Sequence, residues 1–192
     1  MDRRIKYTKK VIKENFLNLL EEKDISNITV KELCMISDIN RGTFYRYYID
    51  IYDLLKSIEQ EFIDEVKNSS SIVKIEDHSI YSFTKGILSI IENNKKLIMI
   101  LFNTNRNLLF LNEVLEIAYD KCFNRWKSFH PEIDEDELEN AVVFIFNGAL
   151  GVINYWVKND FSYSSDDIAK YIEKFCQLGV RMYLPKEQQF NN

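Results

Sequence analysis

Hydrophobic residues recur every three or four positions along most of the chain, which is the spacing of one buried helix face. Ile12, Phe16 and Leu20 follow this spacing and predict a first helix over about residues 5–22. No segment shows the strict alternation of apolar and polar positions that is typical of a strand. Helix breakers are rare, with five Gly and two Pro among 192 residues. The pattern therefore predicts an all-α fold of about nine helices.

Two short helices are predicted after the first one. Thr29 opens a helix over 29–37, because its oxygen can accept an N–H three positions later while a glutamate there reaches back, as in a capping box. A three-residue turn, residues 38–40, follows, and its last residue, Asn40, is a favourable N-cap for a third helix over 41–47. Two short helices joined by such a turn have the dimensions of a helix-turn-helix.

The chain then divides into a head and a larger body. Asp50 is the expected N-cap of a long fourth helix that begins at Ile51 and carries an apolar stripe to Val66. A polar, Ser-rich stretch over 68–77 follows, and we interpret it as the junction. We expect a DNA-binding type of domain over 1–50, with its helix-turn-helix at 29–48, and a helical domain over 51–192. Within the body, the spacing of apolar residues predicts five helices, over residues 78–92, 94–103, 108–129, 135–158 and 164–183.

Charge is distributed unevenly between these parts. The net charge of the chain is −5. Residues 1–47 hold 10 Lys+Arg against 7 Asp+Glu, whereas residues 48–192 hold 15 against 23. A basic head on an acidic body is typical of a protein that contacts an anion with one end only.

The chain offers little material for catalysis or metal binding. Its two His and three Cys do not suffice for a His/Cys metal cluster or a conventional triad. The carboxylates from Asp134 to Glu139 precede a helix, where negative charge favours the helix N-terminus. We therefore expect no catalytic residue, no metal and no cofactor, and an enzyme is the least favoured class.

One segment is apolar enough to raise the question of a membrane. Residues 140–157 carry no charge, but Asn140, Asn147 and Asn154 recur on one side of the helix, where facing lipid would be costly. We expect this helix to be buried on nearly all sides of a soluble protein. The N-terminus shows no secretory signal pattern, and the odd, widely spaced cysteines fit a reducing cytosol, so a cytoplasmic location is expected.

The polar side chains of the third predicted helix strengthen the interpretation of this region as a helix-turn-helix. Arg41, Thr43, Tyr45, Arg46 and Tyr47 place hydrogen-bond donors on one short element. Residues 28–55, ITVKELCMISDINRGTFYRYYIDIYDLL, resemble the DNA-binding signature of the TetR family of bacterial regulators, most strongly in the block 42–48. The segment FNGALGVINYWVKNDFSYSSDDIAKYI also resembles, less specifically, the end of a C-terminal domain found in some members.

The resemblance implies a role for each matching residue. The 41–47 helix would enter the major groove, with Arg41 and Arg46 reading guanine or clamping phosphate. Thr43 would contact a base methyl or a phosphate, and Tyr45 and Tyr47 would mostly bind backbone oxygens. The helix that starts at Thr29 would present N–H groups to a phosphate, and lysines would reach the flanking backbone. The implied DNA-binding residues are Lys6, Lys10, Thr29, Arg41, Gly42, Thr43, Tyr45, Arg46, Tyr47 and Lys56, with Lys9 beside them.

Two departures from the family pattern keep an alternative open. Ser37-Asp38 stands where the family usually has Ala-Gly, and Asp can adopt the left-handed conformation at some cost. Ile51 stands where the family often has Lys, which puts one phosphate contact in doubt. The alternative is a helical interaction protein, or an activator controlled by a protein partner, with weak or no DNA binding.

The resemblance also implies a homodimer through helices 135–158 and 164–183 and a small-molecule effector in the body. The 135–158 helix is apolar at Val142, Ile145, Ala149, Val152 and Trp156 on one side, and at Val143, Phe146, Leu150, Ile153 and Val157 on the other. We expect the first side to face its own core and the second a partner, with Gly148 and Gly151 permitting close approach. The resemblance therefore implies a dimeric repressor that binds a palindromic operator and is released from it by a small-molecule effector. Candidate ligand-binding residues are Phe102, Tyr119, Phe123, Trp126, Phe144 and Asn147, with Arg125 and Tyr155 as further possibilities.

Overall fold

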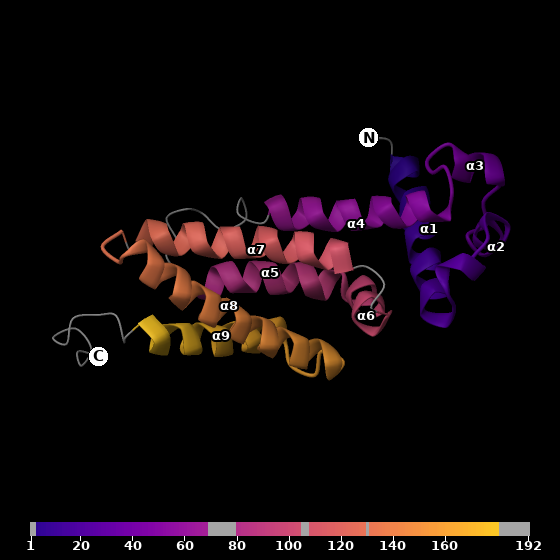
Figure 1. Ribbon diagram of the computed structural model, residues 1–192. Coiled ribbons are helices and arrows are strands. Elements are labelled where there is room, and N and C mark those ends of the chain that lie inside the picture. Colours follow the sequence, from indigo (N-terminus) through magenta and orange to yellow (C-terminus); the bar gives the residue numbers. More distant parts are fainter. Residues whose placement is uncertain (1–2, 69–79, 105–107, 130, 181–192) are drawn as a thin grey trace. The chain divides into compact units, whose positions relative to one another are not determined.

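The computed structural model describes residues 3–68, 80–104, 108–129 and 131–180, and every regular element in these ranges is helical (Figure 1). The chain forms two compact units. The N-terminal unit comprises Met1–Asp64 and Lys96–Arg106, and the C-terminal unit comprises Glu65–Lys95 and Asn107–Asn192. The expected junction over 68–77 lies almost wholly outside the described residues, as does the side chain of Phe102.

The N-terminal unit is built around α1, whose apolar stripe packs on the helices that follow. Phe16 on α1, Phe44 on α3 and Leu54 on α4 are completely buried. The helices of this unit are α1 (Arg3–Glu22), α2 (Val30–Ile36), α3 (Arg41–Tyr45), the first part of α4 (Ile51–Asn68) and most of α6 (Lys95–Thr104), with a 3₁₀ turn η1 (Ile25–Asn27). The predicted helices over 5–22 and 29–37 are confirmed to within two residues.

The third helix is shorter than predicted. It ends at Tyr45, and Arg46 is its C-cap. The chain then tightens, since the Tyr47 N–H donates to the Phe44 carbonyl at 2.9 Å, three positions back. Such a tight last turn is common where a helix ends. The predicted helix over 41–47 is therefore wrong in its last two residues.

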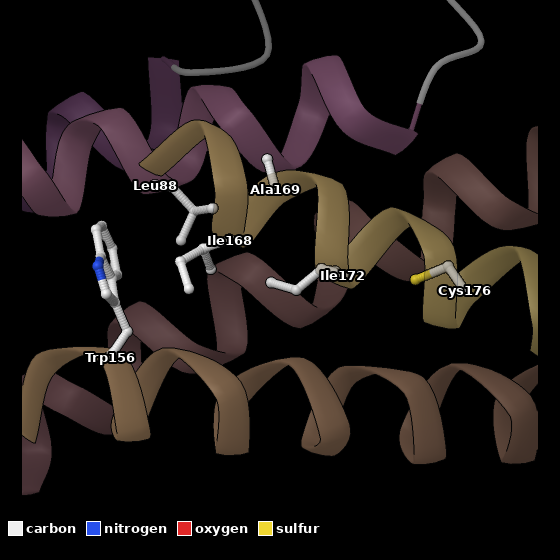
Figure 2. Close-up of a cluster of buried hydrophobic side chains, with 6 residues drawn as sticks. All are labelled: Leu88, Trp156, Ile168, Ala169, Ile172 and Cys176. Carbon is white, nitrogen blue, oxygen red and sulfur yellow. The ribbon is translucent and has the colours of Figure 1, made fainter. Parts of the chain in front are cut away.

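The C-terminal unit places α5 (Ile80–Asn93), α7 (Leu108–Phe129), α8 (Glu135–Lys158) and α9 (Ser165–Val180) side by side (Figure 1). Their apolar stripes meet in a cluster of Leu88, Trp156, Ile168, Ala169, Ile172 and Cys176, which Figure 2 shows between the helices. Fully burying one such large side chain contributes about 1.5–3 kcal/mol. The body helices were predicted to within about two residues wherever the structure describes them.

A polar network closes the contact between α5 and α9. The buried Ser165 hydroxyl donates to Glu92 at 2.6 Å and accepts from the Lys85 ammonium at 2.8 Å. Asp166 accepts from the Tyr81 hydroxyl and forms an ion pair with Lys170 at 2.6 Å. The hydrogen bonds from Lys170 and Tyr81 lower the pKa of Asp166, with the Lys170 bond the larger cause. The network thus holds the beginning of α9 against α5.

The turn between α8 and α9 has a left-handed backbone without glycine. Asp160 and Phe161 have φ of 55° and 57°. The Phe161 N–H donates to the Trp156 carbonyl at 3.0 Å and the Asp160 N–H to the Val157 carbonyl at 3.1 Å, which are the two bonds of a Schellman motif. The Phe161 ring meets the buried Trp156 ring edge-on at 4.7 Å between centroids. Each left-handed residue costs about 1 kcal/mol, and these contacts offset it.

Helix α8 leaves an apolar face in solvent. By length and composition it is the one helix among the described residues that qualifies as a candidate membrane span, but only 17% of that window is buried within the chain. The expectation that it is buried on nearly all sides is therefore wrong for the single chain. Helices α7 and α9 contact α8 and leave one stripe uncovered. We call this stripe the α8 face; it consists of Val143, Phe144, Asn147, Gly148, Gly151 and Tyr155, all exposed.

The α8 face shares only Val143 with the side that the sequence assigned to a partner, so the prediction is right for that residue. Val157 is buried, Phe146 packs edge-on to Tyr119 at 5.5 Å, and Ile153 packs against the buried cluster. These three therefore face the chain's own helices, because α7 and α9 cover more of the circumference of α8 than one apolar stripe. The predicted core side is confirmed, since Val142 and Trp156 are buried and Ile145, Ala149 and Val152 pack on the same cluster.

Candidate nucleic-acid interface

The start of α3 is fixed by Asn40. The Asn40 side-chain oxygen accepts the Thr43 backbone N–H at 2.8 Å, which confirms the predicted N-cap. The Thr43 hydroxyl also donates to this oxygen, at 3.1 Å. The Thr43 proton is thereby directed into the cap, so the outward chemistry of Thr43 is its methyl group and its oxygen lone pairs.

Two aromatic side chains hold α3 against the core of the N-terminal unit. Phe44 is completely buried and Tyr48 nearly so, as the sequence predicted. Their ring centroids lie 5.6 Å apart, and the Lys9 ammonium lies 5.8 Å from the Tyr48 ring. Burial raises the pKa of Tyr48 to about 12, with smaller contributions from Glu61, Asp53 and Tyr47. The Tyr48 hydroxyl therefore stays neutral, and α3 has a fixed orientation.

The opposite side of α3 is a row of polar groups in solvent. Arg41, Gly42 and Arg46 are exposed, and the Tyr45 ring is 56% exposed. Thr43 and Tyr47 are partly buried. All six candidate positions thus lie on one five-residue helix and the turn after it, with two guanidinium groups available for bidentate hydrogen bonds.

The turn between α2 and α3 is intact despite its missing glycine. Asp38 has a φ of 51°, the left-handed conformation expected of it. The Ile39 N–H donates to the Cys34 carbonyl at 3.0 Å and the Asp38 N–H to the Met35 carbonyl at 3.4 Å, again the Schellman pair. Sequence reasoning missed Asn15 on α1, whose amide donates to the buried Ser37 hydroxyl at 3.2 Å and braces this turn. A polar residue beside the α1 apolar stripe was the only signal.

The other candidate DNA contacts lie on three further elements. Lys6 and Lys10 are exposed on α1, and Lys10 pairs with Glu14 at 3.7 Å. Lys9, expected as part of the same basic arm, instead packs its ammonium 5.6 Å from the Tyr47 ring centroid, which connects α1 to the turn after α3. Lys56 is exposed on α4.

Thr29 is exposed and caps α2. Its hydroxyl accepts the Glu32 N–H at 3.2 Å, as predicted. The Glu32 carboxylate, expected to reach back to the cap, instead accepts a hydrogen bond from Lys23 at 2.5 Å. The local sequence gave no sign of this ion pair, because Lys23 lies nine residues earlier, just after the end of α1.

The beginning of α4 carries carboxylates where the family pattern carries a cation. The Asp53 N–H donates to the Asp50 carboxylate at 2.8 Å, which confirms Asp50 as the cap, and the Ile49 N–H donates to the Asp53 carboxylate at 2.9 Å. Ile51 is 5% exposed and packs inward. The α4 N-terminus is therefore neutralised by its own acids and offers no cationic side chain at position 51.

The candidate ligand residues of the C-terminal unit separate into two groups. Tyr119 and Phe123 stack at 6.4 Å on α7, and the buried Tyr119 hydroxyl has no hydrogen-bond partner within the described chain. Trp126 on α7 packs against the buried cluster, and the Arg125 guanidinium lies 5.3 Å from the Phe83 ring. Phe144, 82% exposed, and Asn147 instead lie on the α8 face, as does Tyr155. The ligand role of all of them stays a prediction.

The C-terminal unit identifies the family. A family model for a TetR-type transcriptional regulator C-terminal region matches residues 78–177, more than half of the chain. The chain belongs to the TetR family of transcriptional regulators. The weaker resemblance noted in the C-terminal segment of this TetR-family chain lies within the matched residues.

A sequence relative and several solved structures agree with this assignment. The HTH-type transcriptional regulator YxbF of Bacillus subtilis strain 168 is 36% identical over 76 residues, which is 37% of this chain and 20% of that protein. The TetR-family chain therefore spans about a fifth of the length of this curated relative.

The solved structures cover nearly the whole chain. A TetR regulator from Streptococcus agalactiae 2603V has 23% identity and a TM-score of 0.58, covering 91% of this chain and 96% of its own. A regulator from Aquifex aeolicus VF5 has 17% identity and a TM-score of 0.65, covering 89% and 98%. The FadR regulator of Bacillus subtilis, solved with stearoyl-CoA, has 14% identity and a TM-score of 0.63, covering 88% and 97%. These likenesses show that the TetR-family fold extends over both units.

Proposed function

We propose that this TetR-family regulator is a dimeric repressor that binds a palindromic operator through α3 and leaves it when a small molecule binds the C-terminal unit. The carrying observation is α3 itself. Its inner side is fixed by Phe44 and Tyr48, and its outer side presents Arg41, Tyr45 and Arg46. A short rigid helix with exposed guanidinium groups matches the major groove, where arginine recognises guanine.

We propose that α3 reads base edges while α1 and α4 bind the backbone. In this proposal Arg41 and Arg46 carry sequence information, and Thr43 offers its methyl to a thymine, because its proton is held by Asn40. Tyr45, Tyr47, Lys6, Lys10 and Lys56 bind phosphates and set the register. Thr29 and Gly42 let α2 and α3 approach the backbone. Asp50 and Asp53 at the α4 N-terminus make this interface less cationic. DNA affinity should therefore be lost at a lower salt concentration than the family pattern alone implies.

We propose that the α8 face, with neighbouring α9, pairs with a second copy. One α3 covers only a few base pairs, and two-fold dimers solve this by binding two half-sites. The supporting features are the exposed aromatic side chains Phe144, Tyr155 and Phe175, and the open surface at Gly148 and Gly151. An exposed apolar stripe with glycines at its centre suits a close helix–helix contact.

We propose an effector with an apolar or aromatic body and one polar group. Tyr119 and Phe123 supply a stacked aromatic surface, and the Tyr119 hydroxyl supplies a hydrogen bond that the described chain does not use. A buried hydroxyl without a partner costs about 1–3 kcal/mol, which a bound polar group would recover. Binding would act by favouring a separation of the two heads that mismatches the half-sites.

The test is selection of duplexes from a random DNA library by the purified protein, followed by titration of the enriched duplex at several salt concentrations. We expect a palindrome, a steep loss of affinity with salt, and severe weakening by Arg46→Ala and Tyr45→Ala. Lys158→Ala, an exposed cation on α8, is the matched control and should leave binding unchanged. No enrichment at low salt, with an intact fold, would favour the alternative of an interaction protein controlled by a partner.

A further inference from the structure

The α8 face is centred on a glycine with a polar side chain one turn away in each direction. Asn147, Gly151 and Tyr155 are exposed and follow one another at intervals of four residues. Each therefore lies about 6 Å along the helix from the next and about 40° around it. A Cβ built at Gly151 meets nothing within 4 Å. The centre of the face is thus bare backbone, which another helix can approach closely.

The two polar side chains keep complementary hydrogen-bonding groups. An amide hydrogen of Asn147 donates to the Val143 carbonyl at 2.8 Å, which fixes this side chain along α8 and leaves its oxygen as an acceptor. Tyr155 is 65% exposed, and its hydroxyl makes no hydrogen bond within the part of the chain that the structure describes. The face therefore carries one unused acceptor and one unused donor, placed symmetrically about Gly151.

A two-fold axis through Gly151 brings each donor to an acceptor. Two copies of a helix related by an axis perpendicular to it run antiparallel, so positions at equal distances before and after the axis face each other. Asn147 lies four residues before Gly151 and Tyr155 four residues after it. Each Asn147 therefore faces the partner's Tyr155, and the two hydrogen bonds form together.

The other glycine of the face does not give this match. An axis through Gly148 would place Asn147 opposite the partner's Ala149 and Tyr155 opposite the partner's Ala141. An alanine side chain neither donates nor accepts a hydrogen bond. Both polar groups would then be buried without a partner, which weakens association. The hydrogen-bonding groups of the face therefore select Gly151 over Gly148.

We infer that a second copy pairs with the α8 face in one register, with the two-fold axis at Gly151 and two reciprocal hydrogen bonds from Tyr155 to the partner's Asn147. An apolar helix face alone is compatible with several registers, whereas a polar pair that must be satisfied selects one. The inference rests on the proposed dimer and adds its register. In this dimer Asn147 and Tyr155 bind the second copy and not the effector.

Cysteine crosslinking of the full chain tests the position of the axis. Gly151→Cys puts two thiols at the axis, so mild oxidation with copper–phenanthroline should give a covalent dimer. Gly148→Cys is the matched control, because its two thiols would lie about 9 Å apart along the helices, farther than the roughly 7 Å between Cα atoms that a disulfide spans. The wild-type chain, whose Cys34, Cys122 and Cys176 are free, gives the background.

Two further measurements test the reciprocal pair. An oxidised mixture of Asn147→Cys and Tyr155→Cys should give a covalent dimer, whereas each variant alone should not. Tyr155→Phe keeps the ring and removes the donor of both bonds. It should raise the dimer Kd roughly 25- to 100-fold, from about 5- to 10-fold at each of two symmetric bonds. Tyr52→Phe, at an exposed tyrosine of the N-terminal unit, is the control and should leave the Kd unchanged.

The outcomes separate the register from the dimer itself. The inference is overturned if Gly148→Cys crosslinks and Gly151→Cys does not, or if Tyr155→Phe dimerises with the wild-type Kd. A wild-type chain that dimerises in sedimentation equilibrium but gives neither expected crosslink refutes the register alone. A chain that stays monomeric at every concentration refutes the proposed dimer and the register with it.

Discussion

Substitution of Gly148 should have opposite effects on the single chain and on its dimer. A Cβ built at Gly148 meets nothing within 4 Å, and its backbone φ is not positive, so a side chain fits without strain. Glycine inside a helix costs about 0.5–1 kcal/mol relative to alanine. Gly148→Ala should therefore stabilise the folded monomer by that amount, which raises its Tm by about 1–4 °C for a chain of this size.

The same position should be intolerant of bulk once two copies meet. If the α8 face is the dimer interface, Gly148→Trp separates the two helices at the centre of the contact. A central interface substitution costs about 2 kcal/mol or more, and a two-fold dimer contains it twice. The dimer Kd should then rise by roughly a thousandfold, from a loss of about 4 kcal/mol.

Sedimentation equilibrium over a concentration series measures the Kd, and urea unfolding below that concentration measures monomer stability. Glu139→Trp is the matched control, because it puts the same bulk at an exposed α8 position nine residues away, on roughly the opposite side of the helix. A Gly148→Trp protein with the wild-type Kd would move the interface away from the α8 face. An unstable Gly148→Ala monomer would contradict the open surface at this position.

Three further substitutions test other parts of the structure. Asp38→Gly should raise the free energy of unfolding by about 1 kcal/mol, and with it the urea midpoint, because it relieves the left-handed residue. It should also tighten duplex binding because it removes a negative charge; a lower midpoint would refute the first part. The pKa of Asp166 is held below its ordinary value of 3.8, so its contribution to stability is complete above that value and is lost as pH falls through the folded pKa. Asp166→Asn should therefore reduce the loss of unfolding free energy at acid pH. The same loss in the variant and the wild type would count against the network. Tyr119→Phe should leave stability unchanged or raise it by about 1 kcal/mol while abolishing the response to an effector, and a clear loss of stability in chemical unfolding would mean that the hydroxyl has a partner.

Local signals in the sequence predicted most of the N-terminal unit. The caps at Thr29, Asn40 and Asp50 each depend on neighbours within three residues, and all three form as expected. The left-handed Asp38 was likewise predictable, because the turn between two short helices requires that conformation. The length of α3 was not, since its last turn depends on how Phe44 and Tyr48 pack together.

Contacts between segments that lie far apart in the chain could not be predicted from the sequence. The pattern of α8 is apolar on two sides, and it did not show which side α7 and α9 would cover, so Phe146 and Val157 were assigned outward and lie inward. The bond from Asn15 to Ser37 has the same origin. The functional division at residue 50 stays a prediction. The compact units divide within α4, between Asp64 and Glu65, because each unit is defined by which residues contact one another and not by their order in the sequence.

The exposed α8 face also bears on how much of this protein a cell can keep. A chain that presents Phe144, Tyr155 and Phe175 to water is a substrate for chaperones and proteases for as long as it is alone. Pairing removes that surface, and mass action makes the protected fraction rise with concentration. We therefore expect the cellular half-life to lengthen with expression level, so that occupancy of a two-half-site target rises more steeply than gene dosage.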